Sequence, residues 1–426
     1  MNIPQNLLSG KKVLVGVTGS ISAYKALELV RLFIKSGCEV KVVMSEAAKR
    51  FVTPLSFETL SRNVVLHEET ESWAGSDINM NNHIKVGEWA DLFVIAPCTA
   101  NTIGKLANAI ADNLVLQCAL AYPDMKLLAP AANTNMMNNP LIQGSLKILK
   151  VTNYEVLETQ VKDLACATTG DGALAEPLDI FYASVRELLK EKFWSQRLVM
   201  VTGGGTIEKI DDVRYLSNFS SGKMASSLAL ALYLKGADVN LIATKFDNEL
   251  PSHIHTIEVE SATEMHEYLV DSIRIAKKGQ MSKVSIITDE SLHLIQKEPY
   301  LFMAAAVSDY APTHPQEGKL KKSMLGETWD IKLKQNIDIL NATDRTGVKT
   351  VAFKAEMDIN SAKQNAVTIL DAKNVEAVCL NVLKDSSSFG TDDNAIEIIT
   401  KNGVQDLGSH DKLTLSLKIV DASKNI

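Results

Sequence analysis

One segment constrains the fold more than any other part of the chain. It runs from Arg197 to Ala225 and reads RLVMVTGGGTIEKIDDVRYLSNFSSGKMA. An apolar strand-like run comes first, three glycines (203–205) follow, and residues 220–223 lead into an Ala/Leu-rich helix. Glycine lets the backbone approach an anion, and a helix N-terminus offers unpaired N–H groups. The segment predicts a phosphate-binding crevice or a tight turn without a ligand, and the polar Arg214, Asn218 and Lys223 favour the crevice.

Residues 12–25 repeat this design near the N-terminus. A buried parallel strand is predicted over 12–18, a turn over 19–22 and a helix over 23–35. A chain of 426 residues is also too long for one ordinary core. We therefore expect two domains, 1–190 and 191–426, with an amphipathic helix over 180–196 leading from one to the other.

Strands alternate with helical stretches in both halves. We expect further strands at 39–44, 91–97 and 126–130 in the first half, and at 198–202, 238–243, 301–306, 350–354 and 376–381 in the second. This alternation predicts an α/β protein with two doubly wound, Rossmann-like domains. Residues 268–299 are polar and carry no motif, so the sequence assigns no element to them.

Composition excludes several classes of protein. The net charge of -7 argues against nucleic acid as a partner. Five cysteines without a CxxC pair suggest reduced thiols. The sequence shows no signal peptide and no apolar run of membrane-spanning length, so we expect a cytoplasmic protein without a membrane partner.

The predicted strand ends of the first half carry neutral donors. They are Thr18-Gly19-Ser20, Ser45, the run 97–102 and Asn133, without a Lys or Arg among them. Ligands of doubly wound sheets bind beyond the strand C-termini, and these donors suit a phosphate and a flat heterocycle. The first turn lacks the GxGxxG pattern, which disfavours a classical NAD site.

Longer motifs resemble two known families. GVTGSISAYK, NHIKVGEWADLFVIAPCTANTIGKLANAIADNL and LAC…GDGALAEP are similar to the flavoprotein phosphopantothenoylcysteine decarboxylases. GGTIEKIDDVRYLSNFSSGKM, MAAAVSDYAP, KLKK and VAFKAE are similar to the phosphopantothenate–cysteine ligases. Together they resemble the bacterial bifunctional coenzyme A biosynthesis proteins over nearly the whole chain.

The first resemblance implies an FMN-dependent decarboxylase in residues 1–190. Its catalytic residues would be His83, Asn133 and Cys166. FMN would be held by Gly19, Ser20, Ile21, Ser45, Thr99, Ala100, Asn101 and Thr102. Around Asn133 and Cys166 the chain departs from the family pattern at Ala132, Met137, Ala167, Thr168 and Ala173. An active ligase with an impaired flavoprotein half is therefore an alternative. A flavin-binding regulatory protein is another, because the resemblance of the first domain extends to inhibitory subunits.

The second resemblance implies a CTP-dependent ligase in residues 191–426. Arg214 and Asn218 would handle an acyl-cytidylate, and Lys319 would act at the triphosphate or acyl phosphate. The implied CTP site is Met303, Ala304, Ala305, Asp309, Lys319, Ile337, Asp338, Ile339, Leu340, Phe353 and Lys373. No acidic metal motif is visible, so Mg2+ would be carried mainly by the triphosphate. The family also implies small-molecule substrates and a homo-oligomer, up to a dodecamer built from trimers and dimers.

Overall fold

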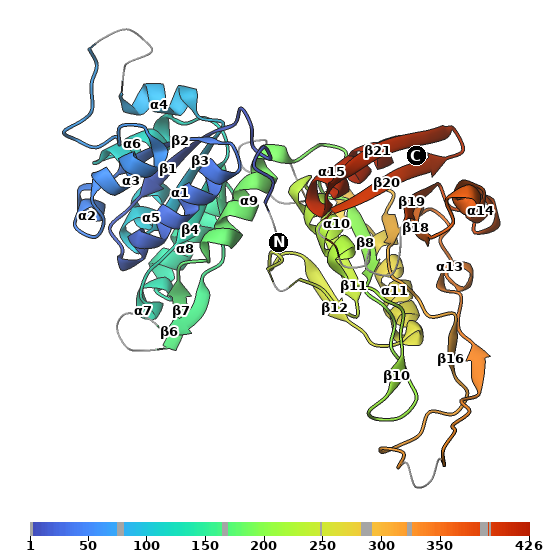
Figure 1. Ribbon diagram of the computed structural model, residues 1–426. Coiled ribbons are helices and arrows are strands. Elements are labelled where there is room, and N and C mark those ends of the chain that lie inside the picture. The colour runs from blue at the N-terminus through green and yellow to red at the C-terminus, as the bar shows by residue number, and fades with distance from the viewer. Residues whose placement is uncertain are drawn as a thin grey trace. The chain divides into compact units, whose positions relative to one another are not determined.

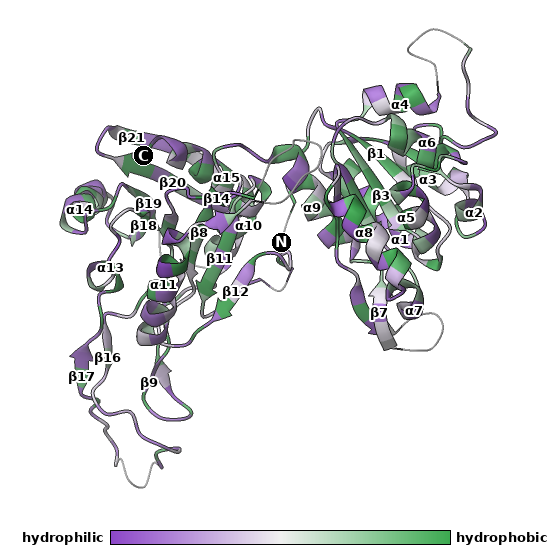
Figure 2. Cartoon of the chain, turned by 180° about the vertical axis from the view of Figure 1, so that it is seen from behind, coloured by the Kyte–Doolittle hydropathy of each residue, from purple (hydrophilic) through white to green (hydrophobic). Residues whose placement is uncertain are grey.

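A computed structural model describes residues 3–74, 81–163, 169–247, 249–282, 292–321, 326–383, 391 and 393–426 (Figure 1). The chain divides into two compact units. The N-terminal unit holds Ile3–Leu189, and the C-terminal unit holds Lys190–Met281 and Leu294–Ile426. Each unit has its own parallel sheet, whose central strands are apolar (Figure 2). The predicted α/β class with two doubly wound domains is confirmed by these sheets and by the families reported below.

The N-terminal unit is built on five parallel strands in the order β2-β1-β3-β4-β5. Every residue of β3 and β4 is buried, which explains their apolar sequences, broken only by Lys126 at the start of β4. Strand order reverses beside β1, and this reversal opens a crevice at the strand C-termini. The strands are β1 (Lys12–Val17), β2 (Glu39–Met44), β3 (Leu92–Cys98), β4 (Lys126–Pro130) and β5 (Tyr154–Val156).

Helices and one hairpin complete this unit. In α1 (Lys25–Lys35) the buried side chains are Ala26, Leu29, Val30 and Phe33, a spacing that gives one apolar face. A 3-10 turn, η1 (Ile21–Tyr24), stands where the sequence predicted the start of that helix. The other elements are α2 (Glu46–Lys49), α3 (Pro54–Ser61), α4 (His83–Trp89), α5 (Ala100–Ala107), α6 (Leu114–Ala121), α7 (Thr134–Met137), α8 (Pro140–Lys150), α9 (Pro177–Leu189) and the hairpin β6 (Gln160–Asp163) and β7 (Thr169–Ala173).

The C-terminal unit is built on eight strands in the order β12-β11-β8-β15-β18-β19-β20-β21. The first six are parallel, and β20 and β21 continue the sheet as an antiparallel tail. The strands are β8 (Leu198–Gly203), β11 (Asp238–Ala243), β12 (His255–Glu258), β15 (Tyr300–Met303), β18 (Lys349–Glu356), β19 (Ala377–Val382), β20 (Asp393–Thr400) and β21 (Gly403–Asp411).

Helices and three short ribbons surround this sheet. Residues 225–234 of α10 (Lys223–Leu234) are all buried, so this helix lies within the core. The other helices are α11 (Ala262–Lys277), α13 (Ile339–Ala342), α14 (Ile359–Ala372), α15 (Lys412–Ala422) and η3 (Ser423–Asn425). The ribbons are β9 (Glu208–Lys209) with β10 (Tyr215–Leu216), β16 (Tyr310–Pro312) with β17 (Leu333–Gln335), and β13 (Gln280–Met281) with β14 (Leu294–Ile295).

One sequence assignment differs from the structure, and one stretch without an assignment contains part of a helix. The helix predicted over 180–196 is α9, which begins at Pro177 and ends at Leu189. It stops there because Trp194 is fully buried against Tyr300 in the C-terminal unit, with ring centroids 5.0 Å apart. The polar stretch 268–299 contains the second half of α11, whose buried Leu269, Ile273 and Ala276 form a narrow apolar stripe. That stripe is hard to detect among charged neighbours.

Lys126 is a buried cation at the start of β4, and it gives a testable expectation. The residue is 2% exposed, and its ammonium lies 4.9 Å from the Tyr154 ring centroid. Burial lowers the pKa of Lys126 to about 8, below the value of about 10.4 for an unfolded chain. Between these values the unfolded state binds more protons, so the contribution of Lys126 to stability rises with pH.

We expect Lys126→Met to be more stable than the parent at pH 7 by about 1–3 kcal/mol, because Met fills the site without a buried charge. That advantage should shrink as the pH rises from 7 to 9. Denaturant unfolding of both proteins across this range measures the difference in their free energies of unfolding. The contributions of other titrating groups are the same in both proteins and cancel in that difference. A difference that does not change with pH would contradict a titrating Lys126.

Candidate functional sites

The first site is a cleft at the C-terminal ends of β1, β2 and β3. Within three residues of the end of each strand stands a hydroxyl side chain that caps the next helix. Ser20 Oγ accepts from Ser22 N at 3.2 Å, Ser45 Oγ from Ala48 N at 3.3 Å, and Thr99 Oγ1 from Thr102 N at 3.3 Å. Three N-terminal turns thus converge on one edge of the sheet, and their N–H groups and hydroxyl protons suit an anion.

This cleft has a volume of about 610 Å³, within the range of small-molecule sites. Gly19 is needed at its base, because a Cβ there would lie 2.5 Å from the Ala47 Cβ. The lining residues are Thr18, Gly19, Ser20, Ser45, Glu46, Ala47, Glu68, Thr99, Ala100, Asn101, Thr102, Lys105, Asp112, Asn113, Ala131, Ala132 and Met136.

The charges in this first cleft are largely neutralised. Lys105 Nζ donates to Asp112 Oδ2 at 2.6 Å, so its charge is paired. Burial, and then a hydrogen bond with Glu46, raise the pKa of Glu68, whereas hydrogen bonds with Lys49 and Glu68 lower the pKa of Glu46. These opposite shifts favour a protonated Glu68 beside an ionised Glu46 that is paired with Lys49. An anion in the cleft must therefore be held by backbone N–H and hydroxyl donors.

The β6–β7 hairpin packs against the edge of this cleft, with its backbone in direct contact with the backbone of the loop after β4. Gly172 O in β7 accepts from Ala132 N at 3.0 Å, next to Asn133. A Cβ on Gly170 would lie 2.3 Å from Thr134 Oγ1, and one on Gly172 would lie 2.2 Å from Ala132 O. The glycines of the GDG sequence therefore let β7 lie directly on the loop that carries Asn133.

The second site is a cleft in the C-terminal unit, with a volume of about 190 Å³. It lies beyond β8, β15, β18 and β19, where the loop before α10 faces the ends of the parallel strands. Gly222 caps α10 with a φ of +73°, and a Cβ there would lie 2.1 Å from Lys245 O. The lining residues are Phe219, Ser220, Ser221, Gly222, Met224, Ala225, Ala304, Ala305, Ala306, Phe353, Lys354, Ala355, Asn381, Leu383, Asn394, Ile396 and Lys412.

Known proteins resemble this chain over its whole length. The family described as Flavoprotein matches residues 1–189, and the DNA/pantothenate metabolism flavoprotein C-terminal domain matches 194–279 and 273–426. The coenzyme A biosynthesis bifunctional protein CoaBC of Haemophilus influenzae is 35% identical over 418 residues, 97% of each chain. That of Bacillus subtilis is 32% identical over 419 residues, again 97% of each. This chain belongs to the CoaBC family.

The predicted family is therefore confirmed, and the chain is an enzyme of coenzyme A biosynthesis with a flavoprotein domain at its N-terminus. A solved structure described as the C-terminal domain of CoaBC aligns with 55% of this chain and 97% of that chain, at 23% identity and a TM-score of 0.41. Among the described residues, no helix is long and apolar enough to cross a membrane.

The first cleft brings together most of the residues that the CoaBC resemblance assigned to FMN. Gly19, Ser20, Ser45 and Thr99 to Thr102 line it, whereas Ile21 is 57% exposed and does not. The cleft is also lined by five residues that the sequence did not indicate, namely Glu46, Glu68, Lys105, Asp112 and Asn113. Lys105 and Asn113 could have been found, because both lie inside the quoted motif that resembles the decarboxylases.

The three residues assigned to decarboxylation differ in where they lie relative to the first cleft. Asn133 caps α7 by accepting from Asn135 N at 2.9 Å, beside the lining residues Ala131 and Ala132. His83 begins α4 outside the lining, with its Nδ1 2.9 Å from Glu71 Oε1 and its ring 5.4 Å from that of Trp73. Cys166 lies outside the described residues. The described residues therefore do not bring His83 into the lining of the first cleft.

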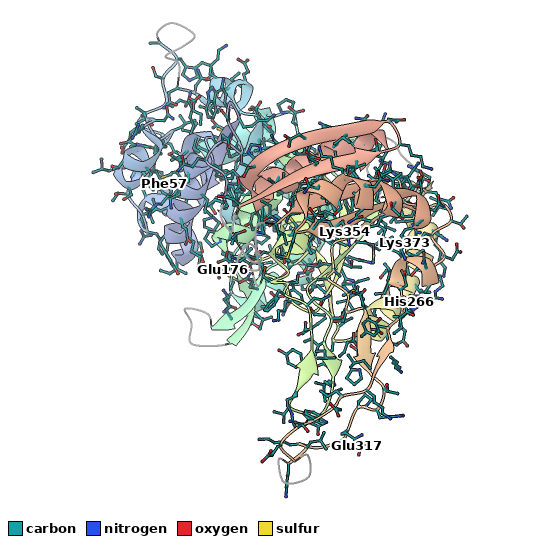
Figure 3. The ribbon with its side chains drawn as sticks, turned by 45° about the vertical axis from the view of Figure 1, so that its right-hand side comes forward. Phe57, Glu176, His266, Glu317, Lys354 and Lys373 are labelled. Atoms are coloured by element: carbon teal, nitrogen blue, oxygen red, sulfur yellow. The ribbon has the colours of Figure 1, made fainter. Side chains whose placement is uncertain are left out.

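The second cleft contains only part of the set assigned to CTP. Ala304, Ala305 and Phe353 line it. Met303 is buried beneath it, and Thr202 Oγ1 lies 3.6 Å from its sulfur. The lining does not include Asp309, Lys319, residues 337–340 or Lys373. Lys373, labelled in Figure 3, pairs with Asp338, which caps the start of α13. The sequence reasoning missed Lys354, Asn381 and Lys412, although Lys354 lies in the quoted VAFKAE motif.

The assigned acyl-cytidylate residues lie on the loop that leads to this cleft. Asn218 Nδ2 donates to Val307 O at 3.0 Å, which joins this loop to the segment after β15. Its neighbour in space is Gly205, where a Cβ would lie 2.5 Å from Asn218 O. Arg214 lies further out, in the turn between β9 and β10, and its contacts are described below.

Proposed function

We propose that the C-terminal unit joins 4′-phosphopantothenate to cysteine with CTP, and that the N-terminal unit decarboxylates the product to 4′-phosphopantetheine. The observation that carries this proposal is the 35% identity to a CoaBC protein across 97% of both chains. A similarity of that extent includes both units. Each unit also has a cleft at the C-terminal edge of its own parallel sheet, where α/β enzymes bind ligands.

The residues of the first cleft fit FMN. Seven of the eight residues assigned to FMN line it, and three capped helix starts converge there. The phosphate would be held by N–H and hydroxyl donors, because Lys105 is already paired with Asp112. When bound, FMN supplies the redox chemistry that the N-acylated cysteine of the substrate needs before its carboxylate can leave as CO2.

The chain's own residues would bind, orient and move protons. Asn133 presents an amide next to the cleft, where it can hold a carboxylate or carbonyl of the substrate. Glu71 Oε1 would accept from His83 Nδ1, which fixes the ring and leaves Nε2 for the substrate. Cys166 would donate a proton to carbon after CO2 has left, because a thiol is a far stronger acid than a serine hydroxyl.

In the ligase half the reaction requires cations, because a carboxylate must approach the phosphorus of a polyanionic nucleotide. Lys319 would supply one, and Mg2+ carried by the triphosphate would supply another. The Ser220-Ser221-Gly222 loop before α10 and the adjoining Ala304–Ala306 segment offer backbone groups to the nucleotide. We propose a homo-oligomer in the cytoplasm as the working form.

An active ligase with an impaired flavoprotein half is the second candidate. It is favoured by Ala132, Met137 and Ala173, which depart from the decarboxylase pattern beside the Asn133 loop and β7. A flavin-binding regulatory protein is a third reading of the N-terminal unit. The complete C-terminal unit argues against a purely regulatory role.

One assay separates these candidates. Purified protein is supplied with phosphopantothenate, cysteine and CTP, and the release of pyrophosphate and CO2 is measured together with flavin absorbance. We expect both products and about one FMN per chain. Pyrophosphate without CO2 would indicate the impaired form, and neither product would exclude both enzymatic readings.

A Cys166→Ser variant tests the proton-donor role in the same assay. CO2 should still be released from phosphopantothenoylcysteine, but phosphopantetheine should not form, because the final protonation lacks its acid. His83→Asn should instead prevent CO2 release. Mass analysis of a single turnover distinguishes the two variants. Normal phosphopantetheine formation by Cys166→Ser would show that another group is the acid.

A further inference from the structure

Asp211 is a buried carboxylate in the turn between β9 and β10. The residue is 2% exposed, and Ile210 N donates to Arg214 O at 2.8 Å to close the turn. Asp211 Oδ1 accepts from Val213 N at 2.9 Å and from Arg214 N at 2.8 Å. Oδ1 of Asp211 thus accepts hydrogen bonds from the turn itself, whereas Oδ2 also has a partner outside the turn.

The second oxygen of Asp211 reaches a segment more than one hundred residues away. Asp211 Oδ2 accepts from Leu320 N at 3.2 Å and from Arg214 Nε at 3.0 Å. Arg214 Nη2 donates to Leu320 O at 2.9 Å, and its guanidinium lies 4.6 Å from the Trp329 ring centroid. Both backbone polar groups of Leu320 are therefore bound by one ion pair.

Asp212 holds the residue on the other side of Lys319. Its Oδ2 accepts from Gly318 N at 2.8 Å, and Gln316 N donates to Ile210 O at 3.0 Å. Lys319 thus lies between two residues whose backbone is fixed, while its own side chain is exposed. The segment belongs to the arm, the part of the chain that extends from β16 and β17 and on which Glu317 is labelled in Figure 3. Its bonds to Ile210, Asp211 and Asp212 join the arm to the turn between β9 and β10.

We propose that Asp211 and Asp212 are positioning residues of the ligase, which set the backbone of Gly318 and Leu320 and thereby the direction of the Lys319 side chain. This inference rests on the proposed role of Lys319. It also gives Arg214 a positioning part, because its guanidinium is bound to Asp211, to Leu320 and to Trp329. Arg214 lowers the pKa of Asp211, so the carboxylate stays ionised at any pH at which the enzyme works.

A double-mutant cycle tests the inference. Asp211→Asn replaces one acceptor oxygen with an amide that repels the Leu320 N–H and the Arg214 guanidinium. We expect it to lower the ligase kcat about tenfold or more, with the KM for cysteine unchanged. In a Lys319→Gln background the same change should lower kcat less than twofold, because the group that it positions is already absent.

The outcomes of this cycle are distinct. An equal loss in both backgrounds would overturn the positioning role, because Asp211 would then act independently of Lys319. If Lys319→Gln alone ligates at the wild-type rate, Lys319 has no catalytic role. If Asp211→Asn still lowers the ligase kcat in that case, the positioning inference is overturned as well. Decarboxylation of supplied phosphopantothenoylcysteine should be unchanged in each variant, which checks folding of the rest of the chain.

Asp212 offers a second test that does not depend on a buried residue. Asp212→Asn keeps an oxygen that can accept from Gly318 N, whereas Asp212→Ala has none. We expect the Ala variant to lose severalfold in kcat and to be cut faster by trypsin after Lys319, and the Asn variant to behave like the parent in both measurements. Equal behaviour of Asn and Ala would overturn the proposed clamp at Gly318.

Discussion

Lys319→Gln should lower ligase turnover on the order of a hundredfold or more. The side chain is exposed, so its replacement leaves the core of the C-terminal unit intact. Removing one charged or oriented donor from a developing negative charge typically costs about 2.7–4 kcal/mol of transition-state stabilisation, which corresponds to this loss. Pyrophosphate release at saturating CTP measures it, and the KM for cysteine should change little.

Lys401→Gln is a matched control for this change. Lys401 is an exposed lysine of the same unit in the turn between β20 and β21, away from the second cleft and from the arm. It should ligate like the parent, and both variants should decarboxylate supplied phosphopantothenoylcysteine normally. A parallel loss of both activities in Lys319→Gln would indicate misfolding, and full ligation would refute the catalytic role.

The framework of the fold was predictable because its signals are local. Each predicted strand of the two central sheets is an apolar run followed by a turn, as in 12–17, 92–98 and 198–203. The same local order placed Ser20, Ser45 and Thr99 at strand ends, and parallel pairing brings those ends to one edge. The antiparallel tail of β20 and β21 was missed, because β21 is mostly polar and exposed and the first residues of β20 are polar as well, so neither strand begins with an apolar run.

The contacts that assemble the ligase arm could not be read from the sequence. Asp211 and Leu320 are 109 residues apart, and the bond between them joins a side chain to a backbone group, which any residue possesses. The pairing of Lys105 with Asp112, seven residues on and across the turn after α5, was likewise not predicted from the sequence. Long-range pairing of this kind depends on the fold as a whole.

Gly172→Ala should reduce decarboxylation about a hundredfold while leaving ligation unchanged. Gly172 has a φ of +134°, which side chains rarely adopt, and its Cβ would lie 2.2 Å from Ala132 O. That oxygen belongs to the backbone and cannot rotate away. The β6–β7 hairpin must therefore move off the loop and break the bond from Ala132 N to Gly172 O. A displacement of about 1 Å at a substrate-positioning group costs on the order of a hundredfold in rate.

The measurement is CO2 release from phosphopantothenoylcysteine, beside the flavin absorbance of the same preparation. Flavin should stay bound in Gly172→Ala, because the helix starts after β1, β2 and β3 are untouched. Gly144→Ala in α8 is the matched control, since a Cβ there meets nothing within 4 Å and alanine favours a helix. Normal CO2 release by Gly172→Ala would contradict this prediction. It would show that the contact between β7 and the Asn133 loop is not what positions Asn133 for decarboxylation.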